Sequence, residues 1–211
     1  MKKIISILFG ASLLVATSAQ SAGMVGIKVG QGELAGESES YTPGTAASKV
    51  SAQSADVSNE YAAIFAEFGL GDTPFSVGLE YVPFEANIRL DKGESSSGAD
   101  VDDATTLYAL FAKEAGAGSV YVKAGYFMAD VNVVQDAQTT VNSFDDSLEG
   151  PMVGIGFQSS ENSNGLIFRG EVTYTDLDSM NITTTSNGST SVKKTADGDI
   201  TTFSIGVGKS F

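Results

Sequence analysis

The sequence contains no cysteine, no histidine and no tryptophan. Without cysteine the chain cannot form a disulfide bond, even in an exported protein, where one would be permitted. Without histidine it lacks the usual base of Ser-His and Cys-His catalysis and the commonest ligand of soft metal ions. We therefore expect no enzymatic activity, no catalytic residues, no cofactor and no metal-binding residues.

Positive charge is also scarce, with 12 lysines and arginines against 26 acidic residues and a formal net charge of −14. Lys2 and Lys3 lie in an N-terminal segment that we expect to be removed, which changes the charge from −14 to −16. So acidic a chain is not expected to bind nucleic acid or anionic lipid, because both would be repelled.

Only one long apolar run is present, and it lies near the N-terminus. Residues 1–3 are basic at positions 2 and 3, residues 4–15 are apolar, and residues 16–22 are small and polar. This layout predicts a signal peptide at residues 1–22, cleaved after Ala19 or Ala22, and an exported domain at residues 23–211. No other apolar run is long enough for a spanning helix. A membrane domain without such helices satisfies its backbone only as a closed barrel.

The exported part divides into stretches of alternating apolar and polar residues, the period of β-strands. We predict eight strands, near residues 24–36, 57–70, 75–90, 104–115, 119–134, 148–159, 166–183 and 200–211. Short Gly-, Pro-, Asn- or Asp-rich turns at 71–74, 116–118 and 161–165 alternate with longer polar connections at 37–56, 91–103, 135–147 and 184–199. Eight strands with alternating connection lengths predict an all-β, eight-stranded antiparallel up-and-down transmembrane barrel, with its long loops outside the cell.

The alternation assigns faces to most strands. The apolar members are predicted to face lipid, and five charged residues are predicted to share the lumen: Lys28, Glu80, Lys123, Arg169 and Glu171. The alternation is weaker at 57–70 and 104–115, where Phe65 and Phe111 would face the lumen if Glu67 and Lys113 do. An eight-stranded barrel is just wide enough to be filled by side chains, so we expect the mixed charges to pair. The alternative is that these pairs open and pass small solutes.

The last strand places Phe203, Ile205, Val207 and Phe211 on one face, and small or polar residues on the other. This stretch resembles the C-terminal assembly signal of bacterial outer-membrane barrels. The resemblance implies the barrel-assembly machinery as a partner. The family usually has an apolar or aromatic residue two positions before the final Phe, where this chain has Lys209.

The whole exported chain resembles the small outer-membrane barrels related to the transmembrane domain of outer-membrane protein A and to the opacity-type surface antigens. The resemblance implies an outer-membrane location, contact with membrane lipid and lipopolysaccharide, and a structural or surface-interaction role. A narrow porin-like channel for ions or small solutes is the alternative function, and a lipid-modifying enzyme ranks third. The alternative fold is a soluble lipocalin-like barrel, in which the apolar faces would point inward.

The predicted outer loops are acidic, which makes them candidate sites for divalent cations such as calcium. Their carboxylates are Asp91, Glu94, Asp100, Asp102, Asp103, Asp136, Asp145, Asp146, Asp197 and Asp199. No spacing among them matches a defined calcium loop. The simpler interpretation is hydration and mutual repulsion at exposed tips.

Overall fold

The computed structural model describes residues 23–38, 53–83, 86–92, 95–134, 139–186 and 190–211, so the predicted signal peptide lies outside the described residues. These ranges form one antiparallel sheet and include no helix long and apolar enough to cross a membrane. The strands are β1 (Gly23–Ser38), β2 (Gln53–Gly69), β3 (Phe75–Val82), β4 (Ala86–Lys92), β5 (Ser95–Glu114), β6 (Gly118–Val134), β7 (Thr139–Phe144), β8 (Ser147–Ser159), β9 (Leu166–Ser186) and β10 (Thr190–Ser210).

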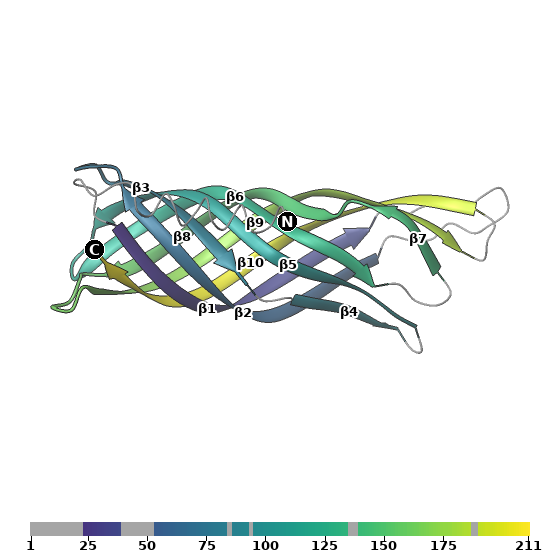
Figure 1. Cartoon of the computed structure of the whole chain (residues 1–211), viewed down its shortest axis with the longest axis horizontal. Coiled ribbons are helices and arrows are strands. Elements are labelled where there is room, and N and C mark those ends of the chain that lie inside the picture. The colour runs from purple at the N-terminus through teal and green to yellow at the C-terminus, as the bar shows by residue number, and fades with distance from the viewer. Residues whose placement is uncertain (1–22, 39–52, 84–85, 93–94, 135–138, 187–189) are drawn as a thin grey trace.

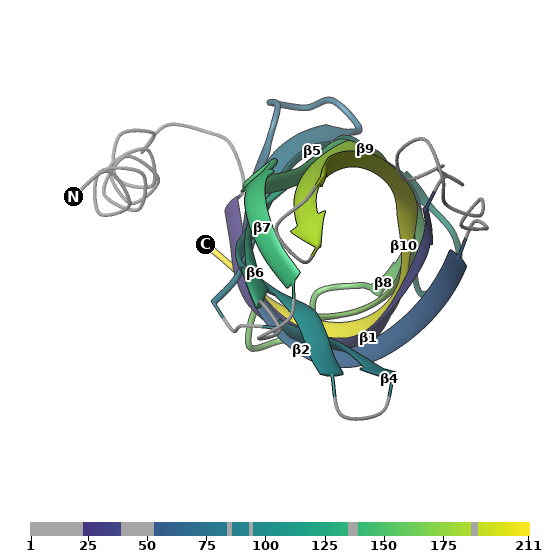
Figure 2. The same ribbon diagram turned by 90° about the vertical axis from the view of Figure 1, so that its right-hand side faces the viewer.

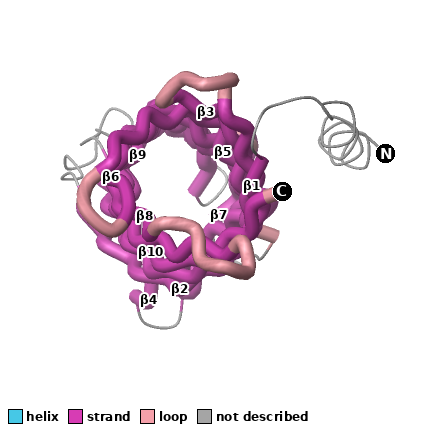
Figure 3. Tube along the Cα trace, turned by 90° about the vertical axis from the view of Figure 1, so that its left-hand side faces the viewer, coloured by secondary structure: helices cyan, strands magenta, loops and turns pink. Residues whose placement is uncertain are grey.

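The sheet closes on itself because β1 pairs with β2 along one edge and with β10 along the other. The closing register runs from Met24 opposite Ser210 to Ser38 opposite Ala196. β3 and β4 both pair with β5, and β7 and β8 both pair with β9, so each of these pairs forms one interrupted strand of the wall. The predicted eight-stranded antiparallel barrel is therefore confirmed, and Figures 2 and 3 show its closed ring from the two ends.

Three tight turns lie at one end of the barrel, which we call the turn end (Figure 1). Each contains a glycine with a left-handed backbone, with φ of 61° at Gly71, 64° at Gly116 and 76° at Gly165. Glycine adopts this conformation without the steric cost that a side chain would impose. The C-terminus lies at this end too, since Ser210 donates a 3.0 Å backbone hydrogen bond to Gly165 of the third turn, and Phe211 exchanges two with Gly23, of 3.1 and 3.0 Å. The three predicted turns are thus confirmed.

At the opposite end, which we call the loop end, the strands run further than predicted. β4 and β5 stay paired up to Lys92 opposite Ser95, and β9 and β10 up to Ser186 opposite Thr190. All four predicted loops, at 37–56, 91–103, 135–147 and 184–199, are therefore largely wrong where described. In the first, β1 continues to Ser38 and β2 begins at Gln53, and in the third, β7 occupies Thr139–Phe144. Residues 39–52, 93–94, 135–138 and 187–189 lie outside the described residues. These extensions are rich in Thr, Ser and Val, which suit strands, but they lack the outward apolar alternation on which the prediction relied.

A belt of large apolar side chains covers the outside of the barrel toward the turn end. The predicted outward sets are exposed, as illustrated by Ile27 at 58%, Ile155 at 62% and Phe203 at 60%. Phe75 and Phe111 pack at 5.1 Å between ring centroids near the turn end, and Tyr126 and Tyr174 lie exposed closer to the loop end. Aromatic residues on both sides of an apolar band are typical of barrels that cross a bilayer.

The apolar side chains change face halfway along the barrel. Beyond the belt, the outward positions carry exposed carboxylates: Glu33, Glu37, Asp56, Glu60, Asp130, Glu149, Asp176, Asp178 and Asp197. The inward positions at this level carry an apolar cluster in which Val131, Leu148 and Leu177 are buried, with Leu34, Val101, Phe127, Met180 and Ile200 packed against them. In the half toward the loop end, apolar side chains therefore point inward, as the lipocalin-like alternative predicted. In the half toward the turn end they point outward.

One face assignment needs correction. Glu67 and Phe65 both point inward and are buried, but Lys113 and Phe111 are exposed on the outside. β5 is apolar on both faces, because inward Tyr108 and Leu110 pack in a buried cluster with residues of β6 and β8. Alternation therefore gave no guide to which face of β5 is internal.

Candidate functional site in the barrel lumen

Two lysines and two glutamates from four different strands meet in the middle of the lumen. Lys28 of β1 lies 2.7 Å from Glu80 of β3 and 2.9 Å from Glu171 of β9. Lys123 of β6 lies 3.0 Å from Glu80 and 3.1 Å from Glu171. All four side chains are buried, and each touches both groups of opposite charge. We call these four residues the charged layer, since they join opposite walls of the barrel.

Arg169 forms a second ionic unit closer to the turn end. Its two terminal nitrogens donate to the two carboxylate oxygens of Glu67 at 2.6 and 2.8 Å, and one also donates to Gln158 Oε1 at 2.7 Å. The Tyr108 hydroxyl donates to Glu67 at 2.7 Å. The guanidinium carbon lies 4.9 Å from the ring centre of Tyr121. Bidentate arginine–carboxylate pairs are among the strongest neutralising contacts in proteins.

The two units together balance their charges. Lys28, Lys123 and Arg169 oppose Glu67, Glu80 and Glu171, and all six side chains are buried. Burying an ion costs several kcal/mol unless an opposite charge and further hydrogen bonds satisfy it. Here the Tyr121 hydroxyl supplies such a bond to Glu171 at 3.0 Å. These six side chains therefore contribute no net charge to the lumen.

Glycines on neighbouring, paired strands make room for the large rings of this region. A Cβ at Gly156 would overlap the Tyr121 hydroxyl, and a Cβ at Gly78 would lie 2.5 Å from the Tyr108 ring. Each tyrosine lies directly opposite its glycine in the register of two paired strands, so its ring can lie over the glycine and leave room in the narrow lumen for the six charged side chains. Gly78 of β3 and the Gly-rich inward face of β8 are thus part of the site.

The structure places all five predicted lumen residues inside the barrel, four in the charged layer and Arg169 with Glu67. The predicted set did not include Glu67, Tyr108, Tyr121 or Gln158. Glu67 could have been found, because it is the acidic residue in an otherwise apolar stretch of β2. The two tyrosines carried no such signal, since aromatic residues also occur in the outer belt.

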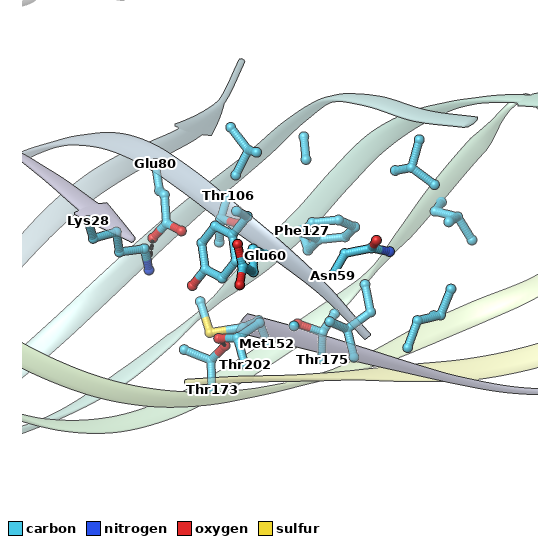
Figure 4. Close-up of a pocket in the computed structure, with 18 of the residues that line it drawn as sticks. Lys28, Asn59, Glu60, Glu80, Thr106, Phe127, Met152, Thr173, Thr175 and Thr202 are labelled. Atoms are coloured by element: carbon cyan, nitrogen blue, oxygen red, sulfur yellow. Dashed lines mark hydrogen bonds and ion pairs between the residues drawn. The ribbon is translucent and has the colours of Figure 1, made fainter. Parts of the chain in front are cut away.

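A cavity of about 170 Å³ lies on the loop-end side of the charged layer (Figure 4). Lys28, Glu80 and Lys123 form part of its wall, and the other lining side chains are mostly apolar or threonine. They include Leu34, Val101, Phe127, Leu148 and Ile200, which also belong to the inward apolar cluster. The cavity thus lies between the charged layer and the inward apolar cluster.

The predicted acidic residues are only partly brought together. Asp102, Asp103 and Asp130 can each place a carboxylate oxygen within 4.8 Å of the others. Asp103 also accepts a 2.6 Å hydrogen bond from the Tyr81 hydroxyl, and Asp102 a 3.3 Å bond from Asn132. Asp145 instead accepts a 2.8 Å bond from the backbone N–H of Asn181. Binding of a divalent cation to these carboxylates stays a prediction.

The terminal strand places its predicted apolar set on the outside. Phe203, Ile205 and Phe211 are exposed, and the Phe211 ring meets the edge of Phe68 with centroids 6.3 Å apart. Lys209 points outward as well, and its ammonium donates to the backbone oxygen of Asn164 at 2.7 Å. The lysine therefore reaches the turn between β8 and β9, which explains how a charge fits at the edge of the apolar belt.

No family model matches the sequence, and no curated protein matches it. Solved structures do match the fold. Neisserial surface protein A is 12% identical and has a TM-score of 0.53 over 90% of this chain and 99% of that chain. The outer membrane protein AlkL is 15% identical, with a TM-score of 0.54 over 93% and 94%. Ail, the attachment invasion locus protein of Yersinia pestis, is 12% identical, with a TM-score of 0.51 over 92% and 100%.

The closed barrel, its outward belt and its ion-paired lumen define a small β-barrel protein of the bacterial outer-membrane type. The fold comparisons agree, and the predicted resemblance is confirmed at the level of the fold. This fold supports the predicted location in a bacterial outer membrane. At these identities the likeness concerns the architecture, so the activity has to be argued from the lumen and the surface.

Proposed function

We propose that this protein is an exported outer-membrane barrel with a structural or surface-interaction role, and that its loop end faces outside the cell. The outward apolar belt supports contact with membrane lipid and lipopolysaccharide. The short turns, and the position of Gly23 beside Phe211 at the same end, support a periplasmic turn end, as in other small barrels. Residues 1–22 serve in this proposal as the cleaved signal for export.

The charged layer is the observation that carries the proposal. Its four side chains join strands on opposite sides of the barrel at 2.7–3.1 Å, and all are buried. Below it, Arg169, Glu67 and the two tyrosines fill the next level. A solute could pass only if several ion pairs separated together inside a low-dielectric space, which is costly. This filling disfavours the channel alternative.

The half toward the loop end supports the surface-interaction role. It extends the strands beyond the apolar belt and carries exposed carboxylates on its outside, among them Glu33, Glu149 and Asp178. Ail was solved in complex with the heparin analogue sucrose octasulfate, a polyanion. A carboxylate-bearing exterior would repel a polyanion, so we expect this protein to bind cationic or neutral partners instead.

Planar-bilayer recordings test whether the lumen conducts. The folded wild-type barrel is expected to show no steady conductance, because the charged layer and the Arg169 level fill the lumen. Folding of the same sample is checked by the shift of its compact band on boiling in detergent gels. Reproducible single-channel steps from correctly folded protein would favour the narrow-channel alternative over the proposed role.

We also propose that Phe203, Ile205, Val207 and Phe211 act as the assembly signal that the barrel-assembly machinery recognises. Phe211→Ala removes the edge contact with Phe68 and is expected to reduce strongly the amount of compact, heat-modifiable barrel in the outer-membrane fraction. Lys209→Leu serves as the matched control, since it keeps the apolar face and is expected to leave assembly unchanged. Normal assembly of the Phe211→Ala variant would argue against the signal.

A further inference from the structure

The cavity at the loop-end side of the charged layer has an unusual lining for the interior of an outer-membrane barrel, which is normally polar. Apolar side chains from several strands of the wall face it: Leu34, Val57, Val82, Val101, Phe127, Leu148, Met152 and Ile200. Figure 4 shows Phe127, Met152 and the threonines at 173, 175 and 202 around the same space. We call this cavity the chamber. Because its lining is largely apolar, it favours an apolar ligand.

The chamber is an empty volume that larger side chains in the wall could have filled. Gly32 lines it, and a Cβ at that position would meet nothing closer than Thr202 Cγ2 at 3.7 Å and Ile200 Cγ2 at 4.0 Å. A larger residue at Gly32 would therefore be accommodated and would remove an empty volume that weakens packing. The described volume of about 170 Å³ is similar to an apolar cavity of about 150 Å³ that is known to hold benzene.

The charges at the chamber's inner wall restrict what it can hold. Lys28 and Lys123 are already neutralised by Glu80 and Glu171, at distances of 2.7–3.1 Å. An anionic ligand would find no free cation beside this low-dielectric space, and a cationic ligand would find only Glu60, whose side chain is exposed to solvent, so both are disfavoured relative to a neutral ligand. Threonine hydroxyls at 106, 173, 175 and 202 line the chamber and can meet one polar atom of a ligand.

From the lining, the volume and the charge balance, we infer that this chamber is a binding site for a small neutral apolar molecule. The ligand has the size of a single aromatic ring, carries at most one hydroxyl or carbonyl group, and enters from the loop end. The charged layer closes the inner side of the site. This inference goes beyond the proposed surface role, and it requires no transport across the barrel.

Methionine methyl groups provide the test, because they lie at known places in the barrel. Met152 is buried and lines the chamber, whereas Met128 is exposed on the outer belt. With ¹³C-methyl methionine in the folded barrel in lipid nanodiscs, benzyl alcohol is titrated as the neutral ligand. The Met152 signal is expected to shift and saturate. The Met128 signal is expected to drift without saturation, since it reports the alcohol that dissolves in lipid.

Two glycine variants form a matched pair for this titration. Gly32→Leu fills the chamber and is expected to weaken the saturable Met152 shift by roughly tenfold or more. Gly170→Leu makes the same change where an added Cβ meets nothing within 4 Å, and is expected to bind as the wild type does. Benzoate and benzylammonium are expected to give no saturable shift.

The inference would be overturned if the Met152 signal drifted without saturation, as the Met128 signal does. It would also be overturned if the Gly32→Leu variant bound benzyl alcohol as tightly as the wild type. Saturable binding of benzoate or benzylammonium as tight as that of benzyl alcohol would overturn the assignment to neutral ligands. These outcomes are independent of the conductance recordings, so failure of the binding site and failure of the proposed function can be told apart.

Discussion

Replacing Arg169 with methionine is expected to lower the free energy of unfolding of the barrel by about 3–5 kcal/mol. Arg169 donates to both carboxylate oxygens of Glu67 at 2.6 and 2.8 Å, and both residues are buried. Without the guanidinium, Glu67 keeps the hydroxyl of Tyr108 but no opposite charge within its pair. Denaturant unfolding of the folded barrel in detergent, followed by the loss of its compact gel band, measures this change.

The control for this variant is Lys113→Met, which removes an exposed cation from the outside of β5 and is expected to change stability little. The double variant Glu67→Gln with Arg169→Met removes both charges, and it should recover part of the loss. If Arg169→Met were no more destabilising than Lys113→Met, the pair would not stabilise the barrel. If the double variant were additive, the two residues would not be coupled.

Replacing Gly156 with leucine is expected to prevent formation of the compact barrel. A Cβ at Gly156 would overlap the Tyr121 hydroxyl and lie 2.6 Å from the backbone oxygen of Gly170 on the paired strand. The ring has little room to move, because Tyr121 is 2% exposed and its hydroxyl donates to Glu171. The clash therefore involves backbone, which a side-chain rotation cannot relieve. The measurement is the heat-modifiable fraction after refolding into detergent.

Gly170→Leu is again the matched control, since the same side chain there meets no described atom within 4 Å of its Cβ. It should refold with the yield of the wild type. A compact, heat-modifiable Gly156→Leu barrel would mean that the inward face of β8 has more space than the close approach of Tyr121 indicates.

The architecture was predictable from strands with one strongly apolar face. In parts of three strands, 122–126 of β6, 168–174 of β9 and 203–207 of β10, the outward positions are apolar or glycine and the intervening ones are charged, small or polar. A single register there places apolar residues against lipid and polar ones in the lumen. Lys123 and Glu171 could be placed in the lumen for this reason. Their pairing followed from the small diameter of an eight-stranded barrel, which leaves buried charges few other partners.

The change of face at the loop end was not predictable in the same way. Leu34 and Ile200 belong to strands whose apolar residues nearer the turn end point outward, yet both face inward. Alternation has the same period on either face, so it does not reveal whether lipid or water surrounds the barrel at a given height. The pairing of Arg169 with Glu67 and the shape of the chamber likewise depend on how strands far apart in the sequence are arranged, which one sequence does not specify.

The change of face also sets how deeply the barrel can sit in a bilayer. Its outward apolar band ends at residues such as Val29, beyond which Glu33 and other carboxylates are exposed. A membrane whose hydrocarbon core were thicker than this band would have to thin around the barrel, because immersing the carboxylates would cost several kcal/mol. The exposed carboxylates thus limit how far the barrel can enter the hydrocarbon core, and the protein should favour membranes whose thickness matches its short apolar band.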